Sequence, residues 1–530
     1  MDSTNQYSGP ATPLLPKGKT LILLLIAGLL FVLHTTYYWS WVEDDSYISF
    51  QYAENLVQGH GLVFNSGERV EGYSNFAWVL LASLALKLGF LPLLVAKVVG
   101  VIGGLVALFF SWLLALKLKP RSGLSATLAP FFLAATPLLP RHAVTGLETA
   151  LFAALLAVGL VFASGEIERR FNPAVPVLLF VLALLRPEGV AFALLVLFWR
   201  VWGYSFLRVL PESLTPIDGY YSSLPSSKKT VFELMLFLIL FISYFLWRWH
   251  YFGALLPNTF HAKMTGEGRA LFEGLNYTLD FLRENGGVAL VGLFLSIFLG
   301  RGLPALFWPL AGAIAVHTVF VILAGGDWMH FYRFFVPVMP LLAAGMAAGM
   351  GTLFDSDKAK AEVPCRGQTV TLRVIMAVIL LTSFMGIYKS ERAASRLVMP
   401  AVRSGSYLTD GYRQAAFWVR ENTPVDSSIA VCDIGILGYL SQRRIIDMFG
   451  LIDPHIARTP GRPHFKSDAD HVLAQDPDTV ILVSEGPGQY LRVPDASLFG
   501  EAEFHSRFTM AHSIGIGFRN EVIQIFQRID

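Results

Sequence analysis

Two adjacent carboxylates, Asp44 and Asp45, follow the first long apolar run of this chain. Paired acids at the mouth of a membrane helix are costly to place, so their presence favours a functional site. One acid could be a general base that deprotonates an acceptor hydroxyl, while its neighbour binds a metal, orients the base or tunes its pKa. Helix capping by Asp is the alternative interpretation, and it explains one of the two residues.

The same loop continues through residues 59–73, where charged and aromatic side chains could line a substrate site. The candidates for hydrogen bonding to a sugar are Glu68, Arg69, Glu71 and Tyr73. An ordered loop shaped by its turn glycines is the alternative.

Two later loops carry side chains that suit a phosphate. Arg offers a planar fork and Lys a point charge, and both fit the phosphate of a lipid. Snorkelling at the bilayer surface and an aromatic belt would place the same residue types there. The candidate substrate-binding residues of these loops are Asn258, His261, Lys263, Asp327, His330 and Arg333, with Asp327 also a candidate second acid or metal ligand.

Arg186 and Glu188 flank a proline in a short loop between two apolar helices. An ionic pair at a membrane boundary is expensive unless it is used, which favours substrate binding over a self-compensating pair in a tight hairpin. Glu148 precedes another apolar helix, and we interpret it as a first-turn acid favoured by the helix dipole.

The elements that must position these residues are membrane helices. The chain has 530 residues, of which 54% are hydrophobic and 15% charged, and its mean hydropathy is +0.53. Soluble proteins carry roughly a quarter charged residues. A net charge of +2 argues against a nucleic-acid partner. Cys365 and Cys432 provide no disulfide framework or metal cluster. No metal ligand or other cofactor is assigned; a divalent cation near the acids stays an open alternative that the spacing of the residues does not support.

Lysine and arginine mark the cytoplasmic side of a membrane protein. Lys17 and Lys19 therefore place residues 1–20 in the cytoplasm, and the first helix leads outward to the acidic pair. Residues 74–90 are interpreted as an interfacial or re-entrant helix. The rule of about 20 apolar residues per span gives about eleven transmembrane helices. They are residues 21–36, 91–116, 124–140, 147–163, 173–185, 190–202, 231–249, 288–299, 303–324, 334–354 and 371–388.

This topology gives a transmembrane module over residues 21–388, with a catalytic first outer loop at 41–90 and a domain outside the cytoplasm at 389–530. The pattern of the last segment predicts a small α/β domain, with a helix at 412–422 and strands at 428–432, 444–448, 479–484 and 521–527. It contains no P-loop and no dinucleotide-binding fingerprint. Asp433 and Asp447 stand at predicted strand ends, where turn formation is the favoured interpretation.

As a set, these motifs resemble the membrane glycosyltransferases of the GT-C superfamily, and within it the group that contains the terminal β-(1→2)-arabinofuranosyltransferase of actinobacterial cell walls. The resemblance is carried by Asp44-Asp45-Ser-Tyr-Ile-Ser-Phe, the run at 61–75, Thr145-Gly-Leu-Glu148, Arg186-Pro-Glu-Gly, Pro257-Asn-Thr, Gly-Gly-Asp327-Trp-Met, Asp433-Ile-Gly and residues 447–454.

The resemblance implies an α-helical polytopic module in the plasma (inner) membrane, with a small soluble α/β domain outside the cytoplasm. It also implies a hexosyl- or pentosyltransferase that uses a polyprenyl-phosphate sugar donor and a glycan or lipid acceptor of the cell envelope. Carried onto this chain, Asp44 or Asp45 is the base. The C-terminal domain is compact beside those of the arabinosyl enzymes, a difference that concerns the sugar and the acceptor rather than the reaction class.

Two other classes of function compete with this interpretation. A transporter or flippase of lipid-linked sugars would use the acids as a proton relay, but it would place charges near the bilayer midplane and show an internal repeat. A non-catalytic partner in glycan assembly would leave the activity of its complex intact after removal of both aspartates.

Overall fold

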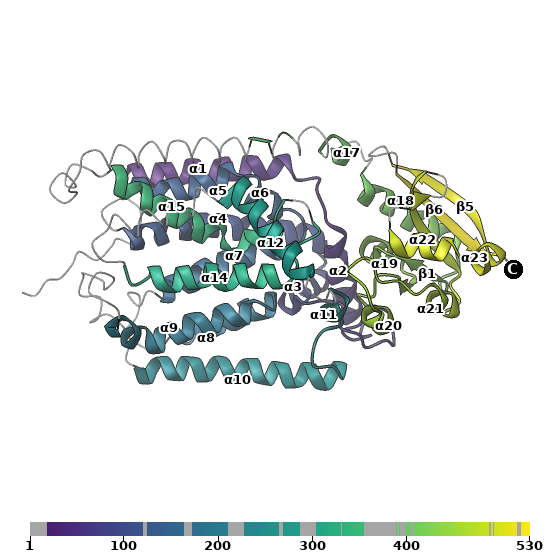
Figure 1. Cartoon of the computed structure of the whole chain (residues 1–530), viewed down its shortest axis with the longest axis horizontal. Coiled ribbons are helices and arrows are strands. Elements are labelled where there is room, and N and C mark those ends of the chain that lie inside the picture. Colours follow the sequence, from purple (N-terminus) through teal and green to yellow (C-terminus); the bar gives the residue numbers. More distant parts are fainter. Residues whose placement is uncertain are drawn as a thin grey trace, which may run out of the picture.

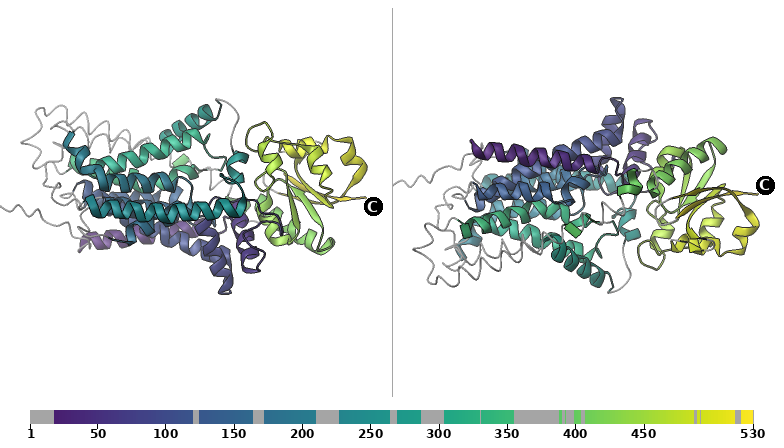
Figure 2. Two further views of the ribbon diagram at one scale, coloured as in Figure 1. Left: turned by 90° about the horizontal axis from the view of Figure 1, so that it is seen from below. Right: turned by 90° about the horizontal axis from the view of Figure 1, so that it is seen from above.

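The structure is a computed structural model. It describes residues 18–119, 124–163, 172–209, 227–263, 269–286, 304–329, 331–354, 388–389, 392, 399–403, 407–486, 489–490, 492–516 and 521–529. Figure 1 shows a bundle of roughly aligned helices with a sheet-containing domain at one end. We call residues 18–354 the helical module and residues 407–529 the C-terminal domain. The two further views in Figure 2 show the same end-to-end arrangement.

The helical module follows the apolar runs of the sequence. Its elements are α1 (Lys19–Tyr37), α2 (Asp44–Val57), α3 (Phe76–Lys87), α4 (Pro92–Leu118), η1 (Ser125–Thr127), α5 (Leu128–Ala135), α6 (Leu138–His142), α7 (Thr149–Ala163), α8 (Ala174–Leu185), α9 (Gly189–Val209), α10 (Ser227–Phe252), α11 (Asn258–Lys263), α12 (Arg269–Phe281), η4 (Leu282–Gly286), α14 (Phe307–Leu323), η5 (Arg333–Val338) and α15 (Met339–Phe354).

Four of the described helical segments are long and apolar enough to cross a membrane. They are Lys19–Tyr37, Pro92–Leu118, Lys228–Phe252 and Arg333–Gly351. Shorter apolar helices accompany them, including α7, α8 and α14. The predicted helical membrane architecture is confirmed. The predicted span 288–299 lies outside the described residues, as does the predicted span 371–388 except for its last residue, Tyr388. With 12 residues, α3 rises only about 18 Å, which is too short to cross a bilayer.

One predicted span was wrong. Residues 124–140 do not form a single helix, because the chain breaks between α5 and α6. Thr136 adopts an extended backbone with ψ 144° immediately before Pro137. Steric conflict with a following proline disfavours the helical conformation, so the break falls at this residue. The break brings Arg141 and His142 to a buried position at the end of α6.

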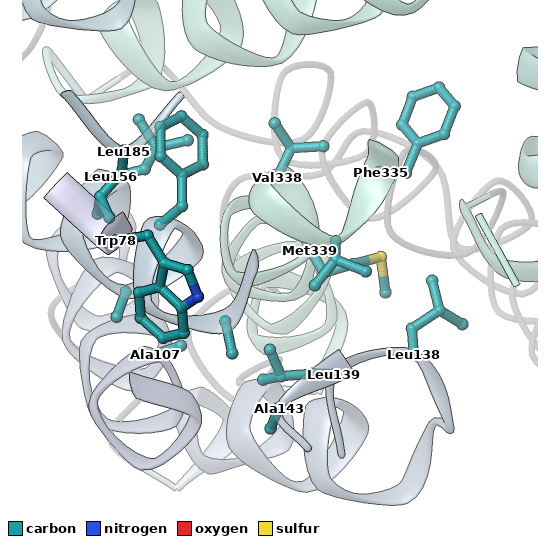
Figure 3. Packing of buried hydrophobic residues seen from close by; sticks show 14 of the residues in the cluster. Trp78, Ala107, Leu138, Leu139, Ala143, Leu156, Leu185, Phe335, Val338 and Met339 are labelled. Atoms are coloured by element: carbon teal, nitrogen blue, oxygen red, sulfur yellow. The ribbon is translucent and has the colours of Figure 1, made fainter. Parts of the chain in front are cut away.

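The helices pack closely through small residues. A Cβ atom on Gly103 of α4 would lie 2.8 Å from the Cα of Leu151 of α7, so only glycine permits this approach. Figure 3 shows part of the resulting core, in which Trp78 of α3, Ala107 of α4 and Val338 of η5 belong to one buried cluster. This rigid packing supports the loops at the end nearest the C-terminal domain.

The C-terminal domain is an α/β unit, preceded by α17 (Met399–Arg403). Its elements are α18 (Leu408–Asn422), β1 (Ser428–Val431), α19 (Ile434–Ser441), β2 (Arg444–Asp447), α20 (Pro454–Arg458), α21 (Ala469–Ala474), β3 (Thr479–Gly486), β4 (Gln489–Tyr490), α22 (Val493–Phe499), α23 (Ala502–Arg507), β5 (Phe508–Gly515) and β6 (Val522–Arg528).

The sheet has the order β2-β1-β3-β6-β5, with β4 paired to β3. β1 runs parallel to β2 and β3, while β6 runs antiparallel to β3 and β5. Successive side chains of β1 face opposite sides, as strand geometry requires. Ile429 and Val431 join the core that continues into the helical module, whereas Ala430 joins a second core on the far face.

The predicted helix and four predicted strands of this domain are confirmed, with boundaries shifted by a few residues. β5 was missed because five consecutive residues in its middle are exposed, which removes the alternation that identifies a strand. The predicted turn role of Asp447 is confirmed, since its carboxylate accepts hydrogen bonds from the backbone of Phe449 and Ile452, each at 2.8 Å.

Candidate active site

The acidic pair lies where the helical module meets the C-terminal domain. Both residues stand in the first turn of α2, and α2 packs against α19. Figure 1 shows α2, α11 and α20 at this junction. The two neighbouring carboxylates meet different surroundings there.

Asp44 caps a helix of the C-terminal domain. Its two carboxylate oxygens accept hydrogen bonds from the backbone N–H groups of Gly435, at 2.8 Å, and Ile436, at 2.7 Å, at the start of α19. A Cβ atom on residue 435 would come within 2.0 Å of the Asp44 carbonyl oxygen, so glycine is required. Capping therefore describes Asp44, but the capped helix belongs to a distant part of the chain.

The environment of Asp44 favours its protonated form. Burial, followed by the negative charge of Asp433, raises the pKa of Asp44 to about 8, although the two backbone N–H groups act in the opposite direction. Asp433 is itself paired with Arg492 and accepts a hydrogen bond from the Tyr412 hydroxyl at 2.7 Å. Asp44 is thus a structural contact between the two parts of the molecule.

Asp45 faces a pocket instead. Within the described part of the chain, no side chain or backbone group donates a hydrogen bond to its carboxylate. The pocket is lined from the helical module by Asp45, Ala262, Lys263 and Trp328, and from the C-terminal domain by Phe449, Leu451, Pro463 and His464. Its volume of about 20 Å³ admits roughly one water molecule. A sugar ring could enter only after these walls separate.

Opposite charges meet in the pocket. Asp45 interacts electrostatically with Lys263 and also with Arg333. Burial and the positive charge of Lys263 lower the pKa of His464, which keeps this imidazole neutral near pH 7. Burial lowers the pKa of Lys263, although the charge of Asp45 acts in the opposite direction. The pocket therefore brings together a carboxylate, a lysine side chain and a neutral imidazole.

Beside the pocket runs a set of polar residues that we call the ion-pair belt. The Arg186 guanidinium donates to Glu188 at 2.5 Å and to Glu148 at 3.1 Å. Glu148 also accepts from the Asn75 side chain at 2.9 Å, and Asn75 accepts from Ser49 at 3.1 Å. The belt comprises Ser49, Asn75, Glu148, Arg186, Glu188, Asp327 and Arg333.

Asp327 and Arg333 form the part of the belt nearest Asp45. Arg333 donates to both Asp327 oxygens, at 2.7 and 3.2 Å. The ring of Phe334 lies against both belt guanidiniums, with centroids 5.5 Å from Arg186 and 5.3 Å from Arg333. Arg186, Glu188 and Arg333 are each less than 10% exposed. The self-compensating pair of Arg186 and Glu188 exists, and Glu148 extends it.

The candidate residues of loop 59–73 lie away from the pocket lining. Glu68 pairs with Arg444 at 2.8 Å, and Glu71 pairs with Arg248 at 2.8 Å. Their candidate sugar-binding role stays a prediction, since both carboxylates are held by arginines in this structure.

Arg69 and Tyr73 belong to the same loop surface. The guanidinium carbon of Arg69 lies 5.1 Å from the centroid of the Tyr251 ring. The Tyr73 hydroxyl is buried and has no hydrogen-bond partner among the described residues.

The candidate residues of α11 have two different roles: some contact the C-terminal domain and one lines the pocket. The Asn258 side chain donates to the carbonyls of Gly450 and Leu451, which ties α11 to the C-terminal domain. The His261 carbonyl accepts from Lys466 at 2.6 Å, whereas Lys263 lines the pocket. His330 lies outside the described residues.

The sequence interpretation missed several residues around the acidic pair. Glu43 accepts a hydrogen bond from the Trp41 indole at 2.8 Å and lies 3.8 Å from Arg141. The Arg141 guanidinium sits between the rings of Trp41 and Phe331, 3.7 and 3.6 Å from their centroids. Glu43 could have been identified from the sequence, because it stands directly before the acidic pair. His464 stands in an irregular loop that offered none.

The described residues contain no group of three or more His, Cys, Asp or Glu side chains arranged to hold a metal ion.

Comparison of the whole structure with solved proteins identifies the fold. ArnT from Cupriavidus metallidurans bound to undecaprenyl phosphate matches with a TM-score of 0.56 over 95% of this chain and 97% of that one, at 14% identity. Its apo structure matches with a TM-score of 0.54 over the same shares. The chain has a GT-C fold. The expected GT-C architecture of the helical module is thereby confirmed.

Sequence comparison identifies two relatives. The terminal β-(1→2)-arabinofuranosyltransferase of Mycobacterium tuberculosis is 26% identical over 351 residues, covering 57% of this chain and 52% of the relative. The protein of the same name in Corynebacterium glutamicum is 32% identical over 113 residues, covering 19% of this chain and 16% of that relative. This chain thus matches about half the length of the first relative. A family described as a domain of unknown function (DUF8728) matches residues 403–522.

Proposed function

We propose that this protein is an integral membrane glycosyltransferase that moves a sugar from a polyprenyl-phosphate donor to a glycan or lipid acceptor of the cell envelope, on the extracytoplasmic face. The observation that carries the proposal is the Asp45 carboxylate, which lines a pocket together with Lys263 and accepts no hydrogen bond from the described residues. A carboxylate open to a substrate beside a basic side chain suits transfer from a phosphate ester, because one group can accept the proton and the other can stabilise the leaving phosphate.

The proposed reaction is a single displacement. Asp45 accepts the proton of the acceptor hydroxyl, whose oxygen attacks the anomeric carbon of the donor. The bond between this carbon and the phosphate oxygen breaks as the new glycosidic bond forms. The leaving polyprenyl phosphate takes the electron pair, and the attack from the opposite side inverts the anomeric centre.

Lys263 is proposed to stabilise the charge on the leaving phosphate. It stands on α11, directly before a part of the chain outside the described residues, and it shares the pocket with Asp45. Arg333 is held by Asp327 and is proposed to contribute positive potential from the belt. The candidate roles of His261 and His330 at the phosphate stay predictions.

Two similarities support the lipid-linked sugar. The GT-C fold is shared with ArnT, which was solved with undecaprenyl phosphate. The curated relatives are named arabinofuranosyltransferases. A polyprenyl-phosphate arabinofuranose is therefore the first donor to test, followed by other pentoses and hexoses. The positive-inside pattern supports a cytoplasmic amino terminus and a pocket on the opposite side.

The test is sugar transfer by the purified full-length protein from synthetic polyprenyl-phosphate sugars. We expect wild type to transfer sugar, and Asp45→Asn to lose turnover while it still binds donor. Asp470→Asn, which changes an exposed acid of the C-terminal domain, is the matched control and should resemble wild type. If wild type consumes no donor but moves labelled lipid-linked sugar across the bilayer of proteoliposomes, the flippase interpretation replaces the glycosyltransferase interpretation.

A further inference from the structure

The pocket has two walls of different origin. Residues before 330 supply Asp45, Lys263 and Trp328, whereas the C-terminal domain supplies Phe449 and His464, together with Leu451 and Pro463. The wall from the C-terminal domain lies within residues 403–522, the segment that the domain of unknown function matches. We propose that this domain supplies the acceptor subsite and that His464 binds a hydroxyl of the acceptor sugar. The proposal rests on the proposed glycosyltransferase function.

In this structure the His464 ring contacts one aromatic residue of its own wall and one of the opposite wall. Its ring meets Phe449 edge-on, with centroids 4.8 Å apart and planes at 88°. It meets Trp328 of the opposite wall at 5.4 Å and 63°. Aromatic contacts of this geometry fix the orientation of a ring without using its polar atoms. The two imidazole nitrogens thus remain available for a ligand.

The backbone of His464 supports a functional placement. Its φ is +62°, in the left-handed region that non-glycine residues seldom adopt. Such conformations persist where the surrounding structure enforces them, and they gather at binding sites. Among the described residues, no donor or acceptor forms a hydrogen bond with the imidazole. A neutral imidazole carries one donor and one acceptor, which suits a sugar hydroxyl.

The direction of approach assigns this wall to the acceptor. The lipid tail of the proposed donor lies in the bilayer, so the donor reaches the pocket from the helical module. Lys263 lines this side of the pocket and can bind the donor phosphate. In a displacement, the attacking hydroxyl must face the side of the anomeric carbon opposite the phosphate. The acceptor therefore meets the wall beyond the module, which is built from Phe449 and His464.

The aromatic residues add a second feature of the subsite. Trp328 is 54% exposed although it lines the pocket, and Phe449 is only 9% exposed. Once the walls have separated to admit a sugar ring, the rings of Trp328 and Phe449 offer flat apolar surfaces for its C–H face, while His464 contacts its hydroxyl edge. Binding sites commonly combine apolar walls with a few placed polar groups in this way.

The experiment compares acceptor and donor recognition in the full-length protein. His464→Gly removes the imidazole and relieves the left-handed backbone, so it tests the side chain without added strain. His464→Asn keeps a donor and an acceptor and tolerates the same backbone. His505→Ala is the matched control, because His505 also meets a phenylalanine edge-on, Phe499 at 4.6 Å, and stands on α23 outside the pocket lining.

We expect His464→Gly to raise the KM for acceptor by about tenfold, the value of one lost hydrogen bond, while the KM for donor changes by less than about twofold. His464→Asn should fall between Gly and wild type, and His505→Ala should match wild type. An unchanged acceptor KM in His464→Gly overturns the acceptor subsite. An equal rise in both KM values overturns it as well, since the residue would then act on the whole pocket.

A binding measurement separates this proposal from the function on which it rests. A synthetic arabinofuranosyl disaccharide is titrated calorimetrically into wild type and His464→Gly without donor. If wild type binds but transfers nothing, and the variant loses binding, the subsite stands and the glycosyltransferase proposal falls. If the variant binds and transfers as wild type does, the subsite falls and the glycosyltransferase proposal stands.

Discussion

The ion-pair belt and the pocket use the same kinds of side chain in opposite ways. In the belt, Arg186 holds Glu148 and Glu188, and Arg333 holds Asp327, so each of these charges has a close partner. In the pocket, Asp45 and His464 face a cavity, and no described residue forms a hydrogen bond with their polar side-chain atoms. The two regions adjoin at Arg333, which interacts electrostatically with Asp45.

The difference shows that close ionic pairing separates supporting groups from reacting groups, although Glu188 Oε2 has no hydrogen-bond partner among the described residues. A buried charge held in a close ion pair is costly to disturb and has little capacity left for a substrate. A group without partners contributes less to stability and can exchange a proton or bind a ligand. The same contrast exists between two consecutive residues. Both carboxylate oxygens of Asp44 accept hydrogen bonds from α19, whereas Asp45 accepts none from the described residues.

Substitution of the pocket carboxylate should have the largest effect on turnover. We expect Asp45→Asn to lower kcat by about 10³-fold, within the range for loss of a general base. Its melting temperature should stay near that of wild type, because no described partner loses a hydrogen bond. Transfer kinetics and a thermal melt in detergent test both statements. A variant that keeps wild-type turnover would remove Asp45 from the reaction.

Substitution in the belt should mainly affect stability. Glu148→Ala leaves Arg186 with one carboxylate and Asn75 without its acceptor, and it should lower the free energy of unfolding by about 3 kcal/mol. Arg283→Ala, which breaks an exposed pair with Asp280, should change it by less than about 0.5 kcal/mol. Denaturation of the purified variants tests the difference. Equal losses in the two variants would contradict the belt as a stabilising unit.

Loss of the inter-domain cap should be milder and should depend on pH. Asn at position 44 has one acceptor oxygen, so Asp44→Asn loses one of the two hydrogen bonds to α19, a cost of about 1 kcal/mol. Hydrogen exchange at the amides of Gly435 and Ile436 should become faster in the variant.

The pH dependence follows from the direction of the Asp44 pKa shift. The folded pKa of about 8 lies above the ordinary value of 3.8, so the folded state holds the proton more tightly between these values. The stabilisation is complete below about pH 4 and is lost as pH rises through about 8. The free energy of unfolding should fall over this interval in wild type. In Asp44→Asn this group's contribution should vanish, and an identical pH profile in both proteins would argue against Asp44 as its source.

The smallest effect is expected at Tyr73. Removal of a buried hydroxyl that has no hydrogen-bond partner among the described residues costs little, so Tyr73→Phe should change the free energy of unfolding by less than about 0.5 kcal/mol and leave transfer intact. The packing of its ring against Tyr52, at 4.8 Å, is retained. A tenfold loss of transfer would instead show that the hydroxyl contacts the substrate after the pocket opens.

Local pattern predicted much of the fold. Long apolar runs indicated the helices, and short runs rich in β-branched residues indicated β1, β2, β3 and β6 of the C-terminal domain. The break before Pro137 was readable from the conformational restriction that a proline imposes on its predecessor, but the apolar count outweighed it. The exposed middle of β5 carries no pattern that distinguishes it from a loop.

The candidate site was predictable in part. The acidic pair stood out by residue type and position, but nothing local distinguishes Asp44 from Asp45. Their difference comes from α19, which the chain reaches almost 400 residues later. Glu148 and Arg186 likewise become partners only when α7 and α8 pack together, so separate inspection of the two motifs assigned Glu148 to a helix dipole.

The bond between Asp44 and Gly435 also orders events during biosynthesis. It joins residues 391 positions apart. At about 5–20 residues per second, the ribosome needs about 20–80 s to cover that interval. Throughout this time the acidic loop exists without the helix that completes it, and the pocket lacks one wall. The pocket therefore becomes complete only when the C-terminal domain has folded back onto the loop, and on the proposed function a nascent chain cannot transfer sugar before that point.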